Sequence, residues 1–335
     1  MYITKEPLFR NFWYPVIPIH LVQKKPIPFT LLGEAIVLWL DEAGSVCAVA
    51  DRCAHRSAQL SAGWVSDGHI VCPYHGWCYN GQGKCVKTFQ NDSGKIPSTY
   101  QVSAFKTKLQ YGYVWVCLNE PLLDIAEFPE AHLENYRLFE CFYETWKTTS
   151  LRVVENELDM AHFAIVHRGT FGDPTHSLPL HAEITDLGEY SLNLHAELSV
   201  QVPEQQQKNT RIFLSNPHQT STRLMDITWY MPFTIRLSLL YPSGLHHVII
   251  NHPTPIDDNH IQVVQFCFRN DKETDVSSED IIKFERKIVD EDRFVLETTD
   301  FNYPLFHEYA EANMPSDKPG MMVRKKIKHF IEKYE

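Results

Sequence analysis

The sequence has no uninterrupted run of about 18 apolar residues, the length that a helix needs to cross a bilayer, so no membrane-spanning helix is expected. It also has no excess of basic residues, because 31 Lys and Arg stand against 42 Asp and Glu and the net charge is -11. A nucleic-acid-binding chain usually presents a basic face. Polyanions are therefore not expected as ligands. No spacing of Ser, Cys, His and Asp indicates a nucleophilic triad either.

The N-terminal residues MYITKEPLFRNFWYPVIP do not resemble a signal peptide, because an acidic residue comes early and no clean apolar stretch precedes a small-residue cleavage site. We therefore expect a cytoplasmic protein whose eight cysteines are thiols or metal ligands rather than disulfides. A plastid, or another compartment reached through a targeting segment that is later removed, is the alternative location.

The length of 335 residues suggests two domains, and 44% hydrophobic with 22% charged residues is ordinary for a globular chain. Residues 1–120 consist of short apolar runs punctuated by Gly, Pro and Asp, which is typical of a small antiparallel-sheet domain. Residues 121–147 mix prolines with acids and are predicted to be a connector. Residues 148–335 contain longer strand patterns and two predicted helices, over about 153–168 and 279–299, so the fold class is α+β.

The strongest chemical signal is a pair of short Cys and His spacings, Cys53-Ala-His55 and, sixteen residues later, Cys72-Pro-Tyr-His75. Four such side chains suit a tetrahedral structural zinc site. They also suit a [2Fe-2S] centre in which two thiolates bind one iron and two imidazoles bind the other. Imidazole ligands raise the potential of such a cluster, so that it accepts electrons from a ferredoxin or a reductase. The six other cysteines are predicted to be free thiols.

The surrounding segment, CAHRSAQLSAGWVSDGHIVCPYHGWCYNGQGKC, resembles the Rieske ferredoxin domain over its whole length. Ala54 stands where that family commonly has Pro, a departure that removes no ligand. Glycine and aromatic residues in the segment would let backbone amides approach bridging sulfides. The resemblance implies that Cys53, His55, Cys72 and His75 bind a Rieske [2Fe-2S] cluster.

A second group of candidate ligands begins at Asn156, in the segment NELDMAHFAIVH. Asp159 and His162 are three residues apart and would share a helical face. His162 and His167 are five apart, about 140° around an ideal helix, so a regular helix would splay them. A π-bulge or a loosened last turn would bring them together, and Gly169 is well placed to end the helix. A surface or hydrogen-bonded histidine pair is the alternative.

After a Rieske domain, the pattern D-x-x-H-x-x-x-x-H resembles the iron motif of Rieske non-haem iron oxygenases, which implies that His162 and His167 bind Fe(II). Such a site needs two histidines and a carboxylate on one face of the metal. A second predicted helix, EDIIKFERKIVDEDRFVLETTD, offers three neighbouring carboxylates. On a helical wheel, Asp292 lies within about 15° of the mean direction of the apolar side chains, Glu291 lies about 90° from that direction, and Asp290 lies on the opposite side. Because a carboxylate facing the core needs a partner, and because Asp292 also matches the family, Asp292 is the predicted third ligand, with Glu291 as the fallback.

Two further residues are predicted to assist the iron motif. Asp159 lies one turn before His162, where a carboxylate could be a fourth ligand or could hydrogen-bond a ligand histidine and fix its tautomer, and the second role is the predicted one. The resemblance implies that Asp159 also faces a Rieske histidine of the next subunit, His75 or His55, and carries the electron route, which requires a head-to-tail homotrimer. Asn156 is predicted either to face the same pocket or to act as a helix N-cap or first-turn residue.

Downstream of the iron motif, the segment HRGTFGDPTH resembles a subgroup of Rieske monooxygenases in which a Gly-Asp turn follows the iron helix. His176 either lines the site entrance or is an ordinary loop histidine. Phe163 and Phe171 are candidates for the pocket wall or for core packing. The basic tail VRKKIKHFIEKYE is predicted to be an amphipathic helix whose charges either face solvent or dock an acidic ferredoxin.

From NFWYPV near its start to the basic tail, the chain is similar to the oxygenase component of Rieske non-haem iron monooxygenases. It looks most like the homotrimeric hydroxylase and O-demethylase branch, which includes dicamba and vanillate demethylases and saxitoxin-pathway alkaloid hydroxylases. The resemblance implies an N-terminal all-β Rieske domain and a C-terminal helix-grip (START-like) antiparallel-sheet catalytic domain with a mononuclear Fe(II). It further implies that O2 hydroxylates or oxidatively dealkylates a small organic substrate, with electrons from NAD(P)H through a reductase or ferredoxin.

Three other functions fit parts of the same pattern. One is a cis-dihydroxylating aromatic ring dioxygenase with the same metals. Another is an electron-transfer Rieske protein that has no catalytic iron. The third is a zinc-stabilised binding module.

Overall fold

The computed structural model describes residues 2–22, 25–90, 94–201, 220–300 and 311–334. The chain forms two compact units. One consists of Tyr2–Ile125 with Thr254–Asp258, and the other of Ala126–Pro253 with Asn259–Glu335. Among the described residues, no helix combines the length and the apolar character needed to span a membrane.

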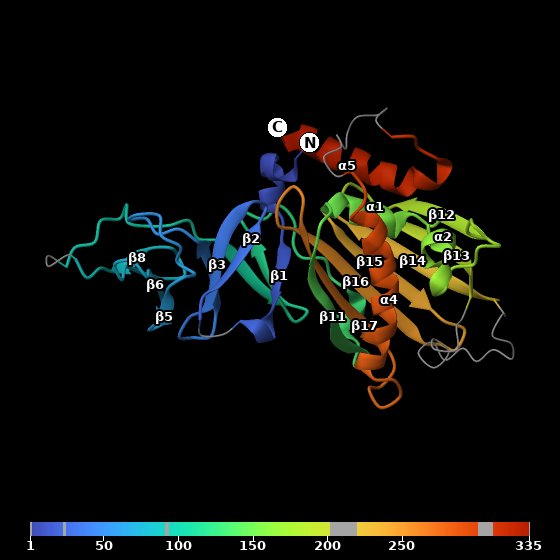
Figure 1. The fold of residues 1–335 in the computed structure, drawn as a ribbon, viewed down its shortest axis with the longest axis horizontal. Coiled ribbons are helices and arrows are strands. Elements are labelled where there is room, and N and C mark those ends of the chain that lie inside the picture. The colour runs from blue at the N-terminus through green and yellow to red at the C-terminus, as the bar shows by residue number, and fades with distance from the viewer. Residues whose placement is uncertain (1, 23–24, 91–93, 202–219, 301–310, 335) are drawn as a thin grey trace. The chain divides into compact units, whose positions relative to one another are not determined.

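The N-terminal unit is built from short antiparallel strands, as the punctuated apolar runs predicted (Figure 1). Buried Trp39 and Tyr79 belong to the same core cluster as Cys53 and Cys72, so the two cysteine loops are anchored on the core of this unit. Its sheets have the orders β1-β10-β9, β2-β3-β4 and β5-β6-β7-β8. The strands are β1 (Tyr14–Pro18), β2 (Ile27–Leu31), β3 (Glu34–Leu40), β4 (Val46–Ala50), β5 (Trp64–Ser66), β6 (His69–Val71), β7 (Cys78–Tyr79), β8 (Cys85–Lys87), β9 (Lys106–Gln110) and β10 (Tyr113–Cys117).

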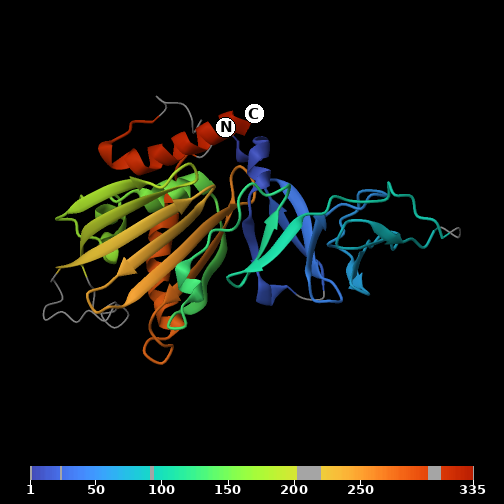
Figure 2. The ribbon, with the colours of Figure 1, turned by 180° about the vertical axis from the view of Figure 1, so that it is seen from behind.

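The second unit is a seven-stranded antiparallel sheet with the order β11-β17-β16-β15-β14-β13-β12. Helices cover one of its faces, and the view from behind shows the other face (Figures 1 and 2). Side chains of β13 alternate between buried and half-buried, as expected for a sheet that is covered on one side. The strands are β11 (Arg137–Trp146), β12 (His181–Asp186), β13 (Ser191–Gln201), β14 (Thr220–Tyr230), β15 (Thr234–Leu240), β16 (His246–Pro255) and β17 (Ile261–Arg269).

The segment predicted as a connector, 121–147, contains β11, the edge strand of the large sheet. This strand pairs with β17, with one irregularity between Glu140 and Phe142. Its inward side chains include buried Phe142 and Trp146, which belong to a core cluster with Val289. The prolines and acids at the start of the segment concealed this strand in the sequence.

The long helix α4 (Ser278–Leu296) lies across the covered face of the sheet (Figure 1). It confirms the helix predicted over about 279–299. Ser277 is its N-cap, and the side chain accepts a hydrogen bond from the backbone N–H of Asp280. A long helix on an antiparallel sheet is the helix-grip arrangement that the family resemblance implied.

The helix predicted over 153–168 is wrong as a single element. Helix α1 (Ser150–Leu158) ends at Asp159, whose backbone is extended (φ -87°, ψ 117°). Asp159 Oδ1 accepts a hydrogen bond from the backbone N–H of Ala161 at 2.8 Å, a local bond that competes with the helical pattern. The chain then resumes as the short α2 (Phe163–Val166) and a 3-10 turn (His167–Gly169). This break, rather than a π-bulge, allows the two histidines of the motif to converge.

The C-terminal helix α5 (Lys318–Tyr334) confirms the predicted amphipathic helix, with buried Val323, Ile327 and Phe330 on one side. Three of its basic residues, Arg324, Lys326 and Lys333, form ion pairs with acidic side chains of the same unit. These three charges are therefore already compensated within the unit.

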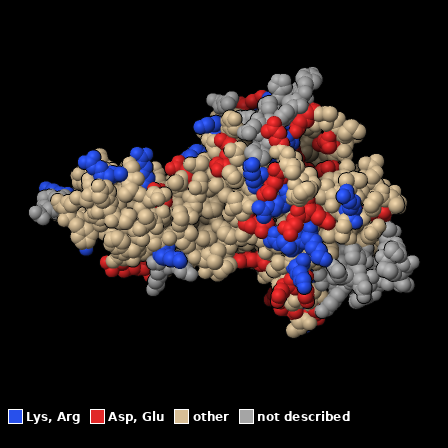
Figure 3. All heavy atoms as spheres, in the orientation of Figure 1, with Lys and Arg blue, Asp and Glu red and all other residues tan. Residues whose placement is uncertain are grey.

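The surface over α4 mixes both signs of charge (Figure 3). Arg286 pairs with Asp290 and with Glu144, and Arg293 pairs with Glu297. Exposed pairs of this kind each contribute about 0–1 kcal/mol to stability. The charges on this face therefore largely compensate one another.

Candidate metal centres

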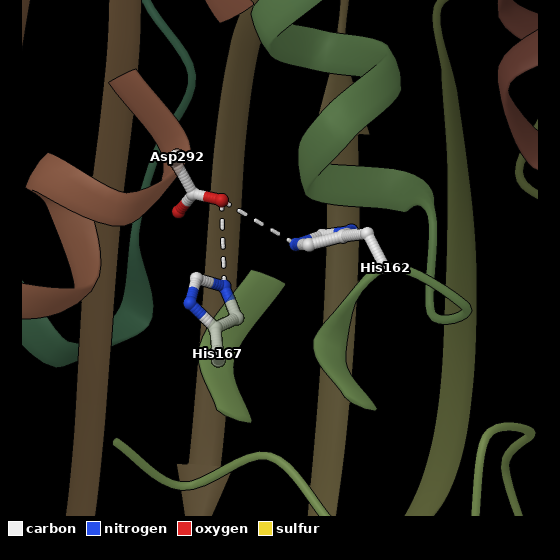
Figure 4. A group of neighbouring side chains, drawn as sticks. All are labelled: His162, His167 and Asp292. Carbon is white, nitrogen blue, oxygen red and sulfur yellow. Dashed lines mark ion pairs between the residues drawn. The ribbon is translucent and has the colours of Figure 1, made fainter. Parts of the chain in front are cut away.

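Three side chains from separate parts of the catalytic unit converge on one point (Figure 4). His162 lies between α1 and α2, His167 follows α2, and Asp292 belongs to α4. His162 Nε2 lies 3.5 Å and His167 Nε2 lies 3.4 Å from Asp292 Oδ1. One ligand atom from each residue lies within 4.8 Å of the other two. Two imidazoles and one carboxylate on one side of a metal form the ligand set of non-haem Fe(II) enzymes.

The chemistry of these side chains fits a bound cation. Both ring nitrogens of His162 are buried and have no hydrogen-bond partner within the described ranges. Buried polar atoms are normally satisfied, so such an orphaned imidazole indicates a ligand that completes it. His162 Nε2 points toward the carboxylate of Asp292, which is itself only 17% exposed.

The electrostatics of the cluster favour the same conclusion. Burial raises the pKa of Asp292 to about 6, although His162 and Asn156 favour its charged form. Burial lowers the pKa of His167 to about 3, and the positive charge of Arg223 adds to this effect. His167 is therefore neutral at neutral pH, which is the form that binds metals. A bound cation would hold Asp292 in its ionised form, because metal binding and ligand deprotonation are coupled.

Glu291, the fallback ligand, contacts His167 instead of the convergence point. Its Oε2 lies 2.9 Å from His167 Nδ1 and accepts a hydrogen bond from the Thr170 hydroxyl at 2.9 Å. A proton on Nδ1 leaves the lone pair of Nε2 facing Asp292, as a metal ligand requires. Asp290 is exposed, in agreement with its predicted place on the helix wheel.

Replacing Glu291 with alanine is expected to lower the iron affinity of the catalytic unit by about 10–100-fold, because His167 loses the partner that fixes its tautomer and ring orientation. Equilibrium titration of Fe(II) under anaerobic conditions measures this change. Asp290→Ala is the matched control, since the neighbouring carboxylate faces solvent. Unchanged iron affinity in Glu291→Ala would mean that the stacking of His167 on Phe171 is sufficient to hold the ring.

Asn156 and Asp159 lie beside the same cluster. Asn156 is inside α1, whose N-cap is Thr149, so the N-cap interpretation of Asn156 is wrong. Its Nδ2 donates a hydrogen bond to Asp292 Oδ1 at 3.1 Å. Asp159 Oδ2 lies 3.7 Å from His162 Nδ1, longer than the hydrogen bond predicted between them. Although burial raises it, the pKa of Asp159 stays below its ordinary value because His162 and backbone amides favour the charged form.

A cavity of about 80 Å³ opens beside the three candidate ligands, between the helices and the covered face of the sheet. Phe163 and Phe171 line it, which confirms the pocket-wall prediction. His176 instead pairs with Asp173 at 2.9 Å, and its side chain is half exposed, as an ordinary loop histidine is. Aliphatic side chains are the largest group among the other lining residues, and they include Met225, Leu237 and Ile249.

Five polar side chains of the cavity wall were not predicted from the sequence: Glu157, Arg223, Asn251, Gln265 and Glu285. Asn251 Nδ2 donates a hydrogen bond to Glu157 Oε1 at 2.6 Å. Burial raises the pKa of both Glu157 and Glu285 to about 7. One signal for Glu285 was present, because it precedes Asp292 by seven residues and therefore shares its helix face.

The buried carboxyl of Glu285 makes the stability of the protein depend on pH. Its pKa is 4.5 in the unfolded chain and about 7 in the folded one. Between these values the unfolded chain releases a proton that the folded chain keeps, so the free energy of unfolding falls as the pH rises and levels off above about 7. From about pH 5 to pH 8, Glu285→Gln should therefore gain about 2–3 kcal/mol in unfolding free energy relative to the unsubstituted protein.

Chemical denaturation at a series of pH values measures this difference. Glu332→Gln, at an exposed position of α5, is the control and should show no such trend. A stability difference for Glu285→Gln that does not change with pH would contradict the burial argument.

In the N-terminal unit, the two Cys and His loops share one backbone pattern. The amides of Cys53 and Cys72 each donate to the carbonyl five residues later at 2.8 Å, and their carbonyls accept from Ser57 and Gly76, four residues later, at 3.0 Å. Ser57 and Gly76 both have positive φ values, 58° and 71°. The two loops therefore present their Cys and His side chains in equivalent ways.

The side chains of these loops fit an iron–sulfur cluster. The Cys53 and Cys72 thiols lie within hydrogen-bonding range of each other, and two backbone amides of the second loop favour the Cys72 thiolate. The rings of His55 and His75 have centroids 4.6 Å apart, and His55 Nδ1 is buried with no hydrogen-bond partner in the described part of the chain. The Tyr79 hydroxyl lies 3.1 Å from Cys53 Sγ, adding a polar contact to the cluster environment.

Paired Cys/His loops on a small antiparallel domain, together with a His-His-Asp cluster under a helix-grip helix, define the class of Rieske non-haem iron oxygenases. Residues 12–105 match the family model of the Rieske [2Fe-2S] domain, and residues 146–333 match that of the vanillate O-demethylase oxygenase C-terminal domain. The chain therefore belongs to the vanillate O-demethylase family of Rieske oxygenase components. Its cofactors are a Rieske [2Fe-2S] cluster and non-haem iron, and its co-substrate is O2.

Relatives match the chain over nearly its whole length. Methylxanthine N1-demethylase NdmA of Pseudomonas putida is 29% identical over 335 residues, which cover 97% of this chain and 90% of that protein. The structure of NdmA with caffeine has a TM-score of 0.82 at 27% identity and covers 98% of this chain and 93% of that one. Dicamba monooxygenase bound to dicamba shares the fold, with a TM-score of 0.80 at 22% identity over 97% of this chain and 98% of that one. These matches support a monooxygenase over the alternatives of ring dihydroxylation, electron transfer alone and zinc binding.

Proposed function

We propose that the chain removes a methyl group from nitrogen or oxygen of a small organic substrate that binds in the cavity beside His162, His167 and Asp292. The convergence of these three side chains beside a cavity that has both apolar and polar walls carries the proposal. The long match to methylxanthine demethylases supports N-demethylation in particular.

The proposed assignment of ligands follows the geometry. His162, His167 and Asp292 hold the mononuclear Fe(II), and Cys53, His55, Cys72 and His75 hold the cluster. When bound, the iron activates O2 with electrons delivered through the cluster from a ferredoxin or a flavin reductase that oxidises NAD(P)H. Hydroxylation of the methyl carbon consumes O2, two electrons and two protons and releases water, and the carbinol then collapses to formaldehyde and the demethylated product.

The residues around the cavity have separate tasks in this scheme. Asn156 and Glu291 orient Asp292 and His167 through the hydrogen bonds described above. Phe163 and Phe171 help to exclude water from the reacting carbon. Glu157, whose pKa is about 7, holds a proton at its carboxyl group close to the cluster of ligands.

Asp159 is proposed to be the electron bridge, facing His75 or His55 of the next chain in a head-to-tail homotrimer. Its carboxylate lies beside His162 and lines a second hollow of about 390 Å³, which shares Asn156, His162 and Leu296 with the wall of the substrate cavity. A carboxylate that borders a hollow on one side and a ligand histidine on the other is suitably placed to contact a second chain. Sedimentation velocity of the purified protein tests the trimer, and a monomer at micromolar concentration would contradict it.

The reaction is tested by incubating the reconstituted protein with a surrogate reductase, NADH and a panel of N-methyl and O-methyl compounds under ¹⁸O2. We expect formaldehyde and a demethylated product in equal amounts, or a hydroxylated product with one labelled oxygen. A cis-diol with two labelled oxygen atoms would contradict the proposal. So would O2 consumption that yields no product from any compound while iron and cluster are both present.

A further inference from the structure

The substrate cavity contains two charged side chains that do not pair with each other. Arg223 extends from β14 in the sheet, and Glu285 extends from α4, which covers it. The positive charge of Arg223 favours the ionised form of Glu285, so the two groups are close enough to interact. Nevertheless, neither an ion pair nor a hydrogen bond joins them, and the described part of the chain offers Glu285 no other hydrogen-bond donor.

The position of Glu285 on an apolar helix face lowers the stability of the folded protein. It is 9% exposed, and it follows buried Phe284 on a helix that packs on the sheet. Seven residues separate it from Asp292, which places it two turns, or about 10 Å, along the helix from the iron ligand. A buried carboxyl without a hydrogen-bond partner destabilises a folded protein, so a ligand is the natural partner for it.

Arg223 is buried in the same way and is held by aromatic rings rather than by a carboxylate. It is 5% exposed, and its guanidinium carbon lies 4.6 Å from the ring centroid of Phe171 and 5.8 Å from that of Tyr241. Its Nε has no hydrogen-bond partner among the described residues. Contacts with aromatic faces fix the plane of the guanidinium and leave its N–H groups available for an acceptor.

A third unsatisfied group lies in the same wall. Asn251 of β16 uses its Nδ2 to contact Glu157, but its Oδ1 is buried and unpartnered within the described residues. The cavity therefore offers donors at Arg223 and acceptors at Glu285 and Asn251, between walls that are otherwise mostly apolar. A site built in this way discriminates strongly against ligands that leave its buried polar groups unpaired.

We propose that Arg223 and Glu285 together select a neutral substrate with a carbonyl acceptor next to an N–H donor, as in a lactam or cyclic urea. The carbonyl accepts from Arg223, the N–H donates to Glu285, and the N-methyl group of the same molecule faces His162, His167 and Asp292. This selection rests on the proposed demethylation and specifies the substrate class that the same cavity takes. Simple carboxylates are disfavoured by Glu285, and hydrocarbons leave both charged groups unsatisfied.

Two cyclic ureas that differ by one methyl group test the proposal. N-methylethyleneurea has a carbonyl, one N–H and one N-methyl group, whereas N,N′-dimethylethyleneurea has no N–H. Binding to the Fe(II)-loaded protein is measured calorimetrically without O2. We expect the monomethyl compound to bind at least about tenfold more tightly than the dimethyl compound.

Substitutions of Glu285 and Arg223 distinguish the contributions of these two side chains to binding. Glu285→Leu should abolish the preference for the monomethyl urea while leaving the affinity for the dimethyl urea within about threefold, because only the N–H contact is lost. Glu285→Gln keeps an acceptor oxygen and should retain most of the preference. Arg223→Met should weaken both ureas by about tenfold, since both have the carbonyl. Iron content and thermal unfolding confirm that each variant is folded.

Equal affinity of the unsubstituted protein for the two ureas, equal losses for both in Glu285→Leu, or no binding of either urea would overturn the inference. The outcome is distinguishable from failure of the proposed function. Formaldehyde from both ureas at equal rates would support demethylation and contradict the proposed substrate selection. Selective binding of the monomethyl urea without any formaldehyde would support the selection and contradict demethylation.

Discussion

The His162→Ala variant is expected to bind no mononuclear iron. Its rate of product formation should fall below about one-hundredth of the rate of the unsubstituted protein. The expectation follows from the position of His162, whose Nε2 is a converging ligand atom with no hydrogen-bond partner among the described residues. Loss even of a group that only orients a ligand typically costs 10–100-fold, so loss of a ligand itself should cost more. Product is measured by mass spectrometry, and iron by metal analysis.

The cluster provides an internal control for this variant. Its ligands lie in the other unit of the chain, so the EPR signal of the reduced cluster should keep its intensity. His176→Ala, which removes a half-exposed loop histidine, should retain both iron and turnover. Normal turnover in His162→Ala would exclude the site described here as the place of O2 chemistry.

Asp159→Asn is expected to retain both iron centres but to slow turnover by about 10–100-fold. The Asn side chain still accepts the hydrogen bond from the Ala161 amide, so the break between α1 and α2 should persist. What disappears is the negative charge 3.7 Å from His162 Nδ1, on the side of the ring away from Asp292. If Asp159 bridges the two centres, electron transfer from the cluster must become the slow step.

Stopped-flow absorbance of the cluster measures this step directly. In the unsubstituted protein with substrate and O2, the reduced cluster should reoxidise at least as fast as product forms. In Asp159→Asn the reoxidation should slow in parallel with turnover, while iron content stays unchanged. Slow turnover with normal reoxidation of the cluster would assign Asp159 to the chemistry at iron rather than to electron delivery.

Much of the candidate site could be predicted because most of its candidate ligands lie in short motifs. The spacing of Cys53, His55, Cys72 and His75 predicted four candidate ligands on two loops, and the structure shows that the loops have equivalent backbone hydrogen bonds. The helix wheel separated Asp292 from Asp290 correctly, since one faces the cavity and the other is exposed. In each case local chain geometry alone decides where the side chain points.

Other features depend on contacts that local patterns do not contain. The interruption at Asp159 arises from one side-chain hydrogen bond, and a helical pattern of apolar residues runs through it unchanged. Arg223 and Asn251 lie on strands. Which of their side chains point to the covered face, and how the strands are paired, becomes known only once the sheet is assembled. The role of Glu291 requires the meeting of α4 with the turn after α2, more than 120 residues away in the sequence.

The burial of Glu285 follows from the sequence, but its role depends on contacts seen in the structure. The wheel that selected Asp292 places Glu285 on the same face, so its burial was predictable from the sequence. Its significance was not, because only the structure reveals that no hydrogen-bond donor among the described residues reaches Glu285 and that Arg223 lines the same cavity. A charged residue that costs stability at a cavity wall is best explained by a ligand.

The central claim is that one chain holds two iron centres with different ligands, and the ratio of iron to acid-labile sulfide tests it most directly. After anaerobic loading with Fe(II) and removal of the excess, we predict about three iron atoms and about two sulfides per chain, two irons in the cluster and one at His162, His167 and Asp292. A ratio of one iron per sulfide in fully loaded protein would contradict the claim, since the cluster would then be the only metal centre.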